Sequence, residues 1–476
     1  MLKIVDAATK AGQRELDALL SSRRAVPDFA TLKQVLPVVE EVLRKGEPAL
    51  RKYVERFDTV APLPQGPKRT EEEISLNGKE GKRRGEMAQA AHAGDGPSYP
   101  SKRIFFPVSA LSARGKSVRA HGSEADISSE FRRAFRAARK RIEAYHRRQV
   151  PSGFAFTDAL GVSFVERPVP LDSVGVYVPG GRAFYPSSLL MGVVPAQVAG
   201  VPRIVVATPP RAWALSAELR WAVRELGVDS ILLAGGAHGI AGLVSVAKVA
   251  KIVGPGNRFV AAAKHLVSGL VAVDLPAGPS EVAILASADA DPALIAADLL
   301  AQAEHDPDAK CLLFTNSGRL AARVRDEALS QLDSFEERSS SKVMRAALRR
   351  GGALFIFKEI SRAASACAAV AAEHVQVMGT GAERFASPLL PTAGALFIGS
   401  ATPTALGDYV AGPNHVLPTG GAARGYSGLS TRDFFRWGRS VSATASAARG
   451  LARPAGVLAR FEGLVAHAAA LGRRSR

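Results

Sequence analysis

The stretch SVGVYVPGGRAFYPSSLLMGVVPAQVAGVPRIVVATP, residues 173–209, sets the pattern for most of the chain. A Val-rich run ends in a glycine turn, a helix is expected to begin at Pro186, and a second β-branched run follows. Proline suits the first turn of a helix, because the N–H that it lacks would be unpaired there. The layout therefore predicts a βαβ unit with parallel strands.

The same alternation continues to about residue 400. Further strand candidates are SILLAGG, KIVGP, EVAILA, CLLFTN, GALFIF and GALFIG, with helical segments among them. A break at SADADPAL, residues 287–294, separates two sets of such units. The predicted fold class is α/β, with two Rossmann-like domains at 123–287 and 288–429 whose parallel-rich sheets are buried on both faces.

Both ends of the chain have a helical pattern. Residues 1–58 repeat apolar residues at three- and four-residue steps, as amphipathic helices do. A Gly/Pro-rich stretch of mixed charge follows at about 64–122, and we expect it to be a poorly ordered insertion within an N-terminal helical region, 1–122. Residues 430–476 are predicted to form a helical tail beyond both α/β domains.

Composition limits the class of protein. With 476 residues the chain can bury two cores, since single cores stop growing at roughly 250–300 residues. Half of the formal charge of +18 lies between Pro64 and Val150. Its first part, residues 64–103, is Gly/Pro-rich, mixed in sign and nearly free of aromatic residues, so no nucleic-acid partner is expected. No apolar stretch reaches the ~20 residues of a membrane span, and only two cysteines are present, Cys311 and Cys367. We expect a cytoplasmic protein without a disulfide framework or membrane contact.

Gln302 and His305 end the apolar segment ALIAADLLAQAEH and are three residues apart, so on a helix they share one face. An amide oxygen and an imidazole at this spacing can reach one metal ion, and Asp408 and His467 could complete the site. Imidazole suits zinc, and oxygen ligands broaden the choice towards manganese. The spacing alone is equally consistent with a histidine that caps a helix end.

Glu373 and His374 are predicted to end a helix before the short run VQVM. Imidazole can take a proton from an alcohol near neutral pH, and a neighbouring carboxylate can activate water. A surface pair without chemistry fits the same residues.

Four other polar residues are candidates for ligand contact. His415 lies in a loop bounded by glycine and proline, where it either serves a ligand or caps a backbone group. Ser280 lacks the G-x-S-x-G setting of a hydrolase nucleophile, so we expect ligand contact without covalent chemistry. Glu462 and His467 are five residues apart, so on one helix they are expected to serve different groups.

Glycine turns close several strand candidates, in VGVYVPGG, LLAGGAHGIAG and KIVGPGNRFV. Open α/β sheets bind ligands at the carboxyl ends of their strands. None of the turns has the dinucleotide fingerprint G-x-G-x-x-G, so a phosphate-binding backbone is indicated without being demonstrated. Tight strand-to-helix turns would explain the same glycines.

From about Phe131 to Ala469 the chain resembles the histidinol dehydrogenase family. The similarity is densest in VGVYVPGG, IVGPGN, VDLPAGPSEV, DLLAQAEH, AAEH, GDYVAGPNHVLPT and EGLVAH, in the family's order, and RKGEPALRKYVERFD near the N-terminus is similar too. The resemblance implies an enzyme that uses Zn²⁺ and NAD to oxidise L-histidinol to L-histidine. It implies two hydride transfers through an aldehyde that stays on the enzyme.

The resemblance also implies roles for individual residues. The implied zinc ligands are Gln302, His305, Asp408 and His467. The implied base that activates water is Glu373, and His374 would take the alcohol proton. Substrate contacts would come from Ser280, His415 and Glu462, and NAD contacts from Tyr177 and Asn257. Family members are homodimers with exchanged tails, so Glu462 and His467 would complete the partner's site.

Two features depart from the family. His238 stands where the family usually has a glutamine that contacts NAD, and we expect altered cofactor affinity from this change. Residues 64–122 do not resemble the family's segment. Two other functions stay open: a dehydrogenase of another small alcohol, such as a sulfonated diol, and an impaired homologue that acts as a binding protein.

Overall fold

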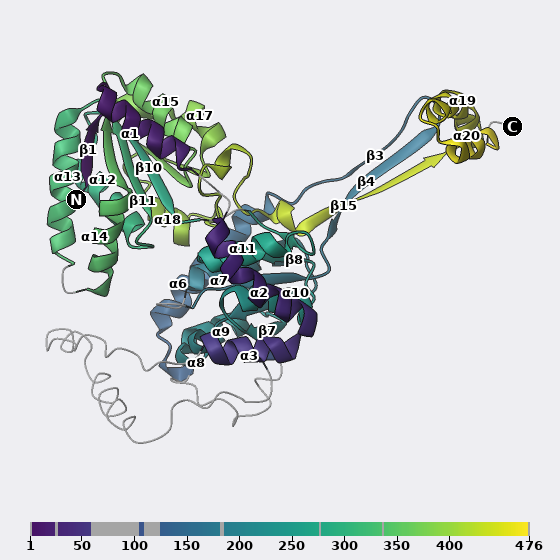
Figure 1. Ribbon diagram of the computed structural model, residues 1–476, viewed down its shortest axis with the longest axis horizontal. Helices are drawn as coiled ribbons and strands as arrows, with labels where there is room; N and C mark the ends of the chain where they lie inside the picture. The colour runs from purple at the N-terminus through teal and green to yellow at the C-terminus, as the bar shows by residue number, and fades with distance from the viewer. Residues whose placement is uncertain are drawn as a thin grey trace.

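The computed structural model describes residues 2–23, 27–58, 104–108, 124–180, 185–275, 278–335 and 338–474. Two six-stranded sheets, each with helices packed on both faces, form the body of the molecule. A narrow arm projects from this body and ends in helices α19 (Ala445–Phe461) and α20 (Val465–Gly472) (Figure 1). The predicted α/β class with parallel-rich sheets is confirmed.

The first sheet has the order β2-β7-β6-β5-β8-β9, and its five strands β5 to β9 are parallel. The strands are β2 (Phe105–Pro107), β5 (Val174–Tyr177), β6 (Ile204–Thr208), β7 (Ser230–Leu233), β8 (Lys251–Val253) and β9 (Ala272–Val273). Valines of β5 pack towards one face and Tyr177 towards the other, because successive side chains of a strand alternate.

Helices cover both faces of the first sheet. One face is covered by α6 (Ser129–Arg147), α7 (Pro186–Val198), α8 (Pro210–Leu215) and α9 (Ala217–Glu225). The other is covered by α2 (Phe29–Lys45), α3 (Glu47–Phe57), α10 (Gly236–Ser245) and α11 (Arg258–Val267). Helix α7 is buried over nearly its whole length, which explains why its sequence is apolar all round.

The second sheet is parallel throughout, with the order β1-β12-β11-β10-β13-β14. Its strands are β1 (Lys3–Asp6), β10 (Glu281–Ala286), β11 (Lys310–Thr315), β12 (Gly352–Ile356), β13 (His374–Met378) and β14 (Ala395–Ile398). Helices α12 (Pro292–Ala303), α13 (Gly318–Asp333) and α14 (Ser339–Gly351) cover one face. Helices α1 (Lys10–Ser21), α15 (Ile360–Val370), α16 (Thr380–Glu383) and α17 (Ala386–Leu389) cover the other.

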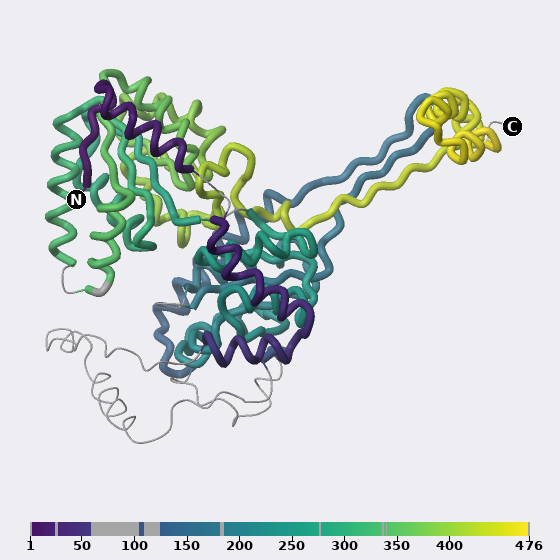
Figure 2. Tube along the Cα trace, in the orientation of Figure 1, coloured from purple at the N-terminus to yellow at the C-terminus, as the bar shows by residue number. Residues whose placement is uncertain are grey.

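The N-terminal 58 residues are shared between the two sheets. Helices were predicted throughout this region, but residues 3–6 form strand β1 at the edge of the second sheet. The chain then crosses over, so that α1 lies on the second sheet while α2 and α3 lie on the first (Figure 2). This crossing brings an N-terminal residue close to the candidate site described below.

The arm contains a three-stranded antiparallel sheet. Strand β15 (Phe435–Ala443) pairs with β4 (Val162–Pro170), which pairs with β3 (Phe154–Thr157). The prediction of helix was wrong for 435–443, because the hydrogen bonds of β15 come from a strand more than 260 residues earlier. Helices α19 and α20 confirm the rest of the helical tail.

Short elements complete the described chain. They are α18 (Thr404–Tyr409) and the 3₁₀ helices η3 (Glu124–Asp126), η4 (Leu390–Thr392), η5 (Ala422–Arg424) and η6 (Thr431–Phe434). Within the predicted insertion, residues 104–108 include the edge strand β2, which pairs with β7, contrary to the expectation of poor order there. The remainder of residues 64–122 lies outside the described residues.

Two further observations bear on the expected compartment and surface. Cys311 and Cys367 are both free and buried. Among the described residues, no helix combines the length and the apolar content that crossing a membrane requires.

Burial of His146 on α6 gives a pH-dependent contribution to stability. The ring is fully buried, and its Nδ1 lies 2.7 Å from Gln149 Oε1, so a neutral ring with Nδ1–H donating fits. The His146 carbonyl accepts a hydrogen bond from Thr431 Oγ1 at 2.9 Å, which ties α6 to η6. Burial lowers the pKa of His146 below its ordinary value.

We therefore predict that His146 makes the protein less stable in mild acid. The unfolded chain binds a proton near pH 6.5 and the folded chain only at lower pH, so this contribution is present above about pH 6.5 and is lost as the pH falls below it. The free energy of unfolding, measured by urea titration at pH 7.5 and 5.5, should fall less in His146→Phe than in wild type. Equal falls in both proteins would contradict the prediction.

Candidate active site

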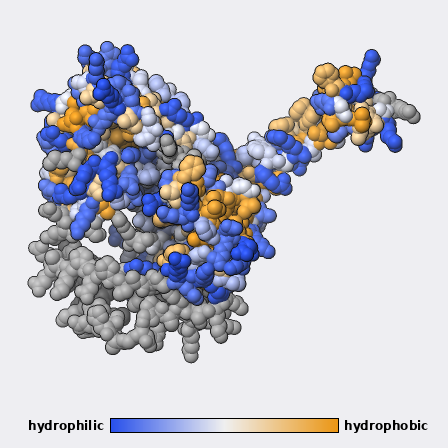
Figure 3. Space-filling view, in the orientation of Figure 1, coloured by the Kyte–Doolittle hydropathy of each residue, from blue (hydrophilic) through white to orange (hydrophobic). Residues whose placement is uncertain are grey.

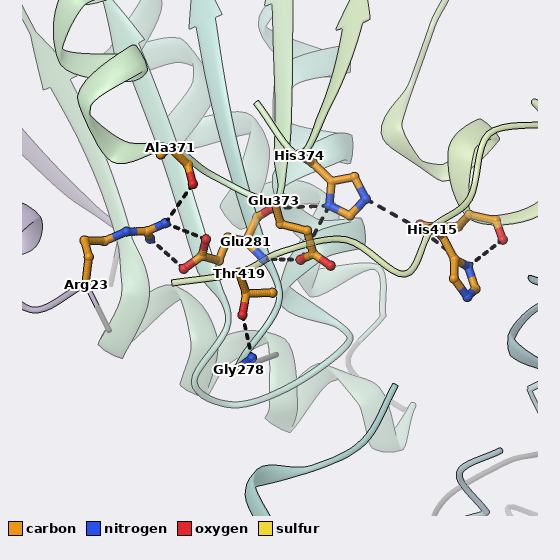
Figure 4. A network of polar contacts seen from close by, with 9 residues as sticks. Arg23, Gly278, Glu281, Ala371, Glu373, His374, His415 and Thr419 are labelled. Atoms are coloured by element: carbon orange, nitrogen blue, oxygen red, sulfur yellow. Dashed lines mark hydrogen bonds and ion pairs between the residues drawn. The ribbon is translucent and has the colours of Figure 1, made fainter. Parts of the chain in front are cut away.

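Glu373 and His374 lie at the amino-terminal edge of the second sheet. Helix α15 ends at Val370, and Ala371 adopts a left-handed conformation with φ of 49°. The predicted position at a helix end was therefore wrong: Glu373 lies in the turn and His374 begins β13. Because β13 pairs with β10 in the register His374 to Val282, both residues lie beside Glu281, the first residue of β10 (Figure 4).

The main chain of Glu281 contacts both members of the pair. Its N–H donates to Glu373 Oε2 at 2.8 Å, and its carbonyl oxygen lies 3.3 Å from His374 Nδ1. A carbonyl can only accept, so Nδ1 carries the proton in this contact and Nε2 keeps its lone pair. The His374 Nε2 atom faces Asp408 Oδ1 at 3.8 Å.

Burial controls the protonation of these groups. It raises the pKa of Glu373 well above the ordinary value, and the charges of Glu281 and Asp408 add to the effect. The Glu281 N–H and the Ser280 hydroxyl oppose it by hydrogen bonding. Burial lowers the pKa of His374 to about 3, so this imidazole is neutral at pH 7. When Glu373 is ionised, its carboxylate is a stronger proton acceptor than an ordinary glutamate, whereas the neutral His374 ring beside it is a weaker one than an ordinary histidine.

Asp408 and His415 approach the same edge from α18 and the loop after it. Burial raises the pKa of Asp408 to about 6, and His305 opposes the rise. The Nδ1 atom of His415 lies 3.0 Å from the Asp408 carbonyl oxygen, so His415 does bond to the backbone. Burial lowers the pKa of His415 to about 4, which leaves its ring neutral at pH 7.

Gln302 and His305 come from the end of α12. The helix ends at Ala303, and the N–H of His305 donates to the Gln302 carbonyl at 3.3 Å, so His305 lies in the turn that follows. Gln302 is 3% exposed, and its Nε2 has no hydrogen-bond partner among the described residues. An unsatisfied buried amide is costly, so a further group is expected beside it.

These side chains supply a donor set that suits zinc, with imidazole nitrogen and amide and carboxylate oxygen. The described part of one chain nevertheless holds no group of three or more His, Cys, Asp or Glu that could hold a metal ion. His467, the fourth predicted ligand, lies on α20 at the tip of the arm, and Glu462 ends α19 nearby (Figure 1). The structure thus brings five of the predicted site residues towards one edge of the second sheet: Ser280, Glu373, His374, Asp408 and His415. His305 is close enough to affect the pKa of Asp408. Glu462 and His467 lie apart from this edge, at the end of the arm.

The three residues expected to contact a cofactor lie along the carboxyl edge of the first sheet. Strand order reverses between β5 and β8, and this is where open α/β sheets bind ligands. Tyr177 ends β5, and its hydroxyl accepts a hydrogen bond from the Gly236 N–H at 2.9 Å. Asn257 follows β8 and caps α11 by accepting from the N–H groups of Phe259 and Val260.

The turn after β8 approaches β5 so closely that it needs glycine. Gly254 has a φ of +119°, and an added Cβ would lie 2.2 Å from the Tyr177 carbonyl oxygen. Next to this turn, the start of α11 is exposed, and its Phe259 and Val260 N–H groups donate to the Asn257 side chain. The glycine at 254 therefore serves tight packing at the edge where open α/β sheets bind ligands.

His238 makes a contact that the sequence did not reveal. The residue is buried, its Nε2 lies 2.8 Å from Asp58 Oδ2, and its ring lies against Tyr53 and Phe57. The same Asp58 oxygen accepts the Gly235 N–H at 2.9 Å. The contacts of His238 and Gly235 with Asp58 thus link the end of α3 to the turn after β7, at the candidate cofactor edge.

The sequence analysis also missed Arg23 and Glu281, a buried ion pair beside Glu373. One signal was available: Glu281 opens the fully buried strand EVAILA, and a charge in such a place requires a partner. The identity of that partner could not be read from the sequence, because Arg23 is 258 residues away.

A doubly wound α/β sheet of the kind that binds nucleotides, together with buried acid–base groups on a second sheet, is compatible with a dehydrogenase. Comparison with known proteins identifies the family. The sequence model of the family described as "Histidinol dehydrogenase" matches residues 108–475. Histidinol dehydrogenase of Bradyrhizobium diazoefficiens is 45% identical over 345 residues, 72% of this chain and 79% of that protein. That of Brucella suis is 38% identical over 460 residues, 96% of this chain and 95% of the relative.

A solved structure extends the similarity to the fold. The crystal structure of histidinol dehydrogenase from Elizabethkingia anophelis superposes with a TM-score of 0.78 at 26% identity, covering 99% of this chain and 98% of the other. The chain belongs to the histidinol dehydrogenase family.

Proposed function

We propose that the protein oxidises L-histidinol to L-histidine through bound L-histidinal, with NAD as oxidant and Zn²⁺ at the site, in histidine biosynthesis. The observation that carries this proposal is the placement of Glu373 and His374. Both are buried, and both are held by the main chain of Glu281, so a carboxylate and an imidazole are available together. Family membership supplies the substrate.

When bound, NAD would accept hydride in each oxidation, and zinc would hold the substrate's nitrogen atoms and orient the reacting carbon. Gln302, His305 and Asp408 would hold the metal together with His467 of the tail. Tyr177, His238 and Asn257 line or support the cofactor edge, and Ser280, His415 and Glu462 would contact substrate.

The acid–base work divides between two side chains. The Nε2 lone pair of neutral His374 would take the alcohol proton in the first oxidation, and burial makes this imidazole a weaker base than an ordinary histidine. Burial makes the carboxylate of Glu373 a stronger base than an ordinary glutamate, which suits it to take a proton from water in the second. A site that keeps the aldehyde bound also prevents loss of a reactive intermediate.

We further propose a homodimer with exchanged tails. Large apolar side chains are exposed at the end of the arm, with Phe461 92% and Val465 77% exposed (Figure 3). A tail that stands away from its own body and carries such residues requires a surface to cover it. Docking on a second copy would bury this surface and would bring Glu462 and His467 to the partner's site.

Glu373→Gln is predicted to impair the aldehyde-to-acid step more than the alcohol oxidation, because only that step needs activated water. An amide cannot accept the proton, so a loss of about 10²-fold or more is expected in single-turnover assays started from histidinal. The control is Glu143→Gln, which removes a carboxylate from the surface of α6. Equal losses in both half-reactions would reject this role for Glu373.

Complementation between two inactive variants tests the exchanged tails. His305→Asn and His467→Asn are each expected to be inactive and to lose bound zinc. After unfolding and refolding together, a mixed dimer with exchanged tails has one site with both lesions and one with neither, so activity and zinc should partly return.

If each tail served its own body, every site in the mixture would keep one lesion. No return of activity or zinc in mixed dimers verified by mass would then exclude tail exchange. Each variant refolded alone is the matched control, because it gives the background of unfolding and refolding.

A further inference from the structure

We infer that Arg23 and Glu281 form a positioning pair that fixes Glu373 and His374 for the reaction; this rests on the proposed function. Arg23 binds the Glu281 carboxylate through both terminal nitrogens, Nη1 to Oε1 at 2.5 Å and Nη2 to Oε2 at 2.6 Å (Figure 4). Two parallel hydrogen bonds fix the direction of the carboxylate as well as its distance.

The pair is buried. The Arg23 side chain is 7% exposed and that of Glu281 is 5% exposed. Each charge is therefore screened little by water, and either one alone would be left uncompensated in the interior. A surface ion pair of similar geometry, such as Arg136 with Glu225, has the solvent as an alternative partner.

Glu281, whose carboxylate is fixed by Arg23, contacts both candidate catalytic residues through its main chain. Its side chain is held by Arg23, while its N–H bonds to the Glu373 carboxylate and its carbonyl bonds to the His374 ring. A rotation or shift at the start of β10 would therefore change both contacts together. Within the described residues, Arg23 makes no hydrogen bond or ion pair with either catalytic side chain, so it acts through Glu281.

Arg23 also contacts the opposite segment. Its Nη2 donates to the Ala371 carbonyl at 3.5 Å, in the left-handed turn that leads from α15 into Glu373 and β13. One guanidinium thus joins the start of β10 to the turn before β13. Because Arg23 follows α1, the N-terminal segment takes part in building the site.

Arg23→Gln should lower kcat about tenfold or more, since small misplacements of catalytic groups have large effects on rate. The KM for NAD should change less than about threefold, because the cofactor residues lie on the first sheet. Arg23→Lys should fall between wild type and Arg23→Gln, because an ammonium cannot make the bidentate contact. The double variant Arg23→Gln/Glu281→Gln should recover part of the loss, because no buried charge is left unpaired.

The matched control is Arg136→Gln, which breaks the bidentate surface pair on the first domain and should keep wild-type kcat. All rates are compared below the melting temperature of every variant and per folded protein. If Arg23→Gln fails to fold, Arg23→Lys carries the test. A kcat within twofold of wild type in folded Arg23 variants would overturn the inference, even if the melting temperature falls.

Hydrogen exchange separates failure of this inference from failure of the proposed function. Arg23→Gln or Arg23→Lys should speed amide exchange in peptides covering 278–286 and 371–378, with little change over the first sheet. If the wild-type protein were inactive on L-histidinol, the proposed function would be rejected. The exchange data would still show whether the Arg23–Glu281 pair holds the two segments in place. Unchanged exchange at both segments would overturn it.

Discussion

Most of the candidate chemistry depends on the register between β10 and β13. His374 pairs with Val282, so Glu373 and Glu281 meet where the two strands begin. Three buried or partly buried carboxylates, Glu281, Glu373 and Asp408, approach one another there, and in the described part of the chain Glu281 is the one paired with a buried cation. Removing one partner of a buried pair typically costs about 3–5 kcal/mol. Burying these charges is therefore costly, which is consistent with the acid–base roles that we propose for Glu373 and His374.

The two candidate sites lie at opposite ends of the strands in the two sheets. The first presents the carboxyl ends of its strands, where we propose that the cofactor binds. The second presents the amino ends of β10 and β13, where the acid–base groups lie. At the corresponding carboxyl edge of the second sheet, exposed Asp289 accepts hydrogen bonds from Thr380 and Ser287.

The sequence was sufficient for the α/β class because alternating apolar runs and glycine turns are local signals. It was insufficient for β1 and β15, whose hydrogen bonds come from strands hundreds of residues away. The same limit applies to the site. Gln302, His305, Glu373 and His374 could be singled out by type and spacing, but Arg23, Asp58 and the boundary of α15 depend on contacts across the fold. The roles proposed for Glu462 and His467 would depend on a second chain.

We propose that one site carries out two successive oxidations of the same substrate. This can be measured as the amount of NADH formed when the zinc-loaded protein consumes a limiting amount of L-histidinol with excess NAD. We expect two NADH per L-histidinol, L-histidine as the product and no free aldehyde captured by an added trapping amine. One NADH per L-histidinol with aldehyde released, or no NADH at all, would contradict it.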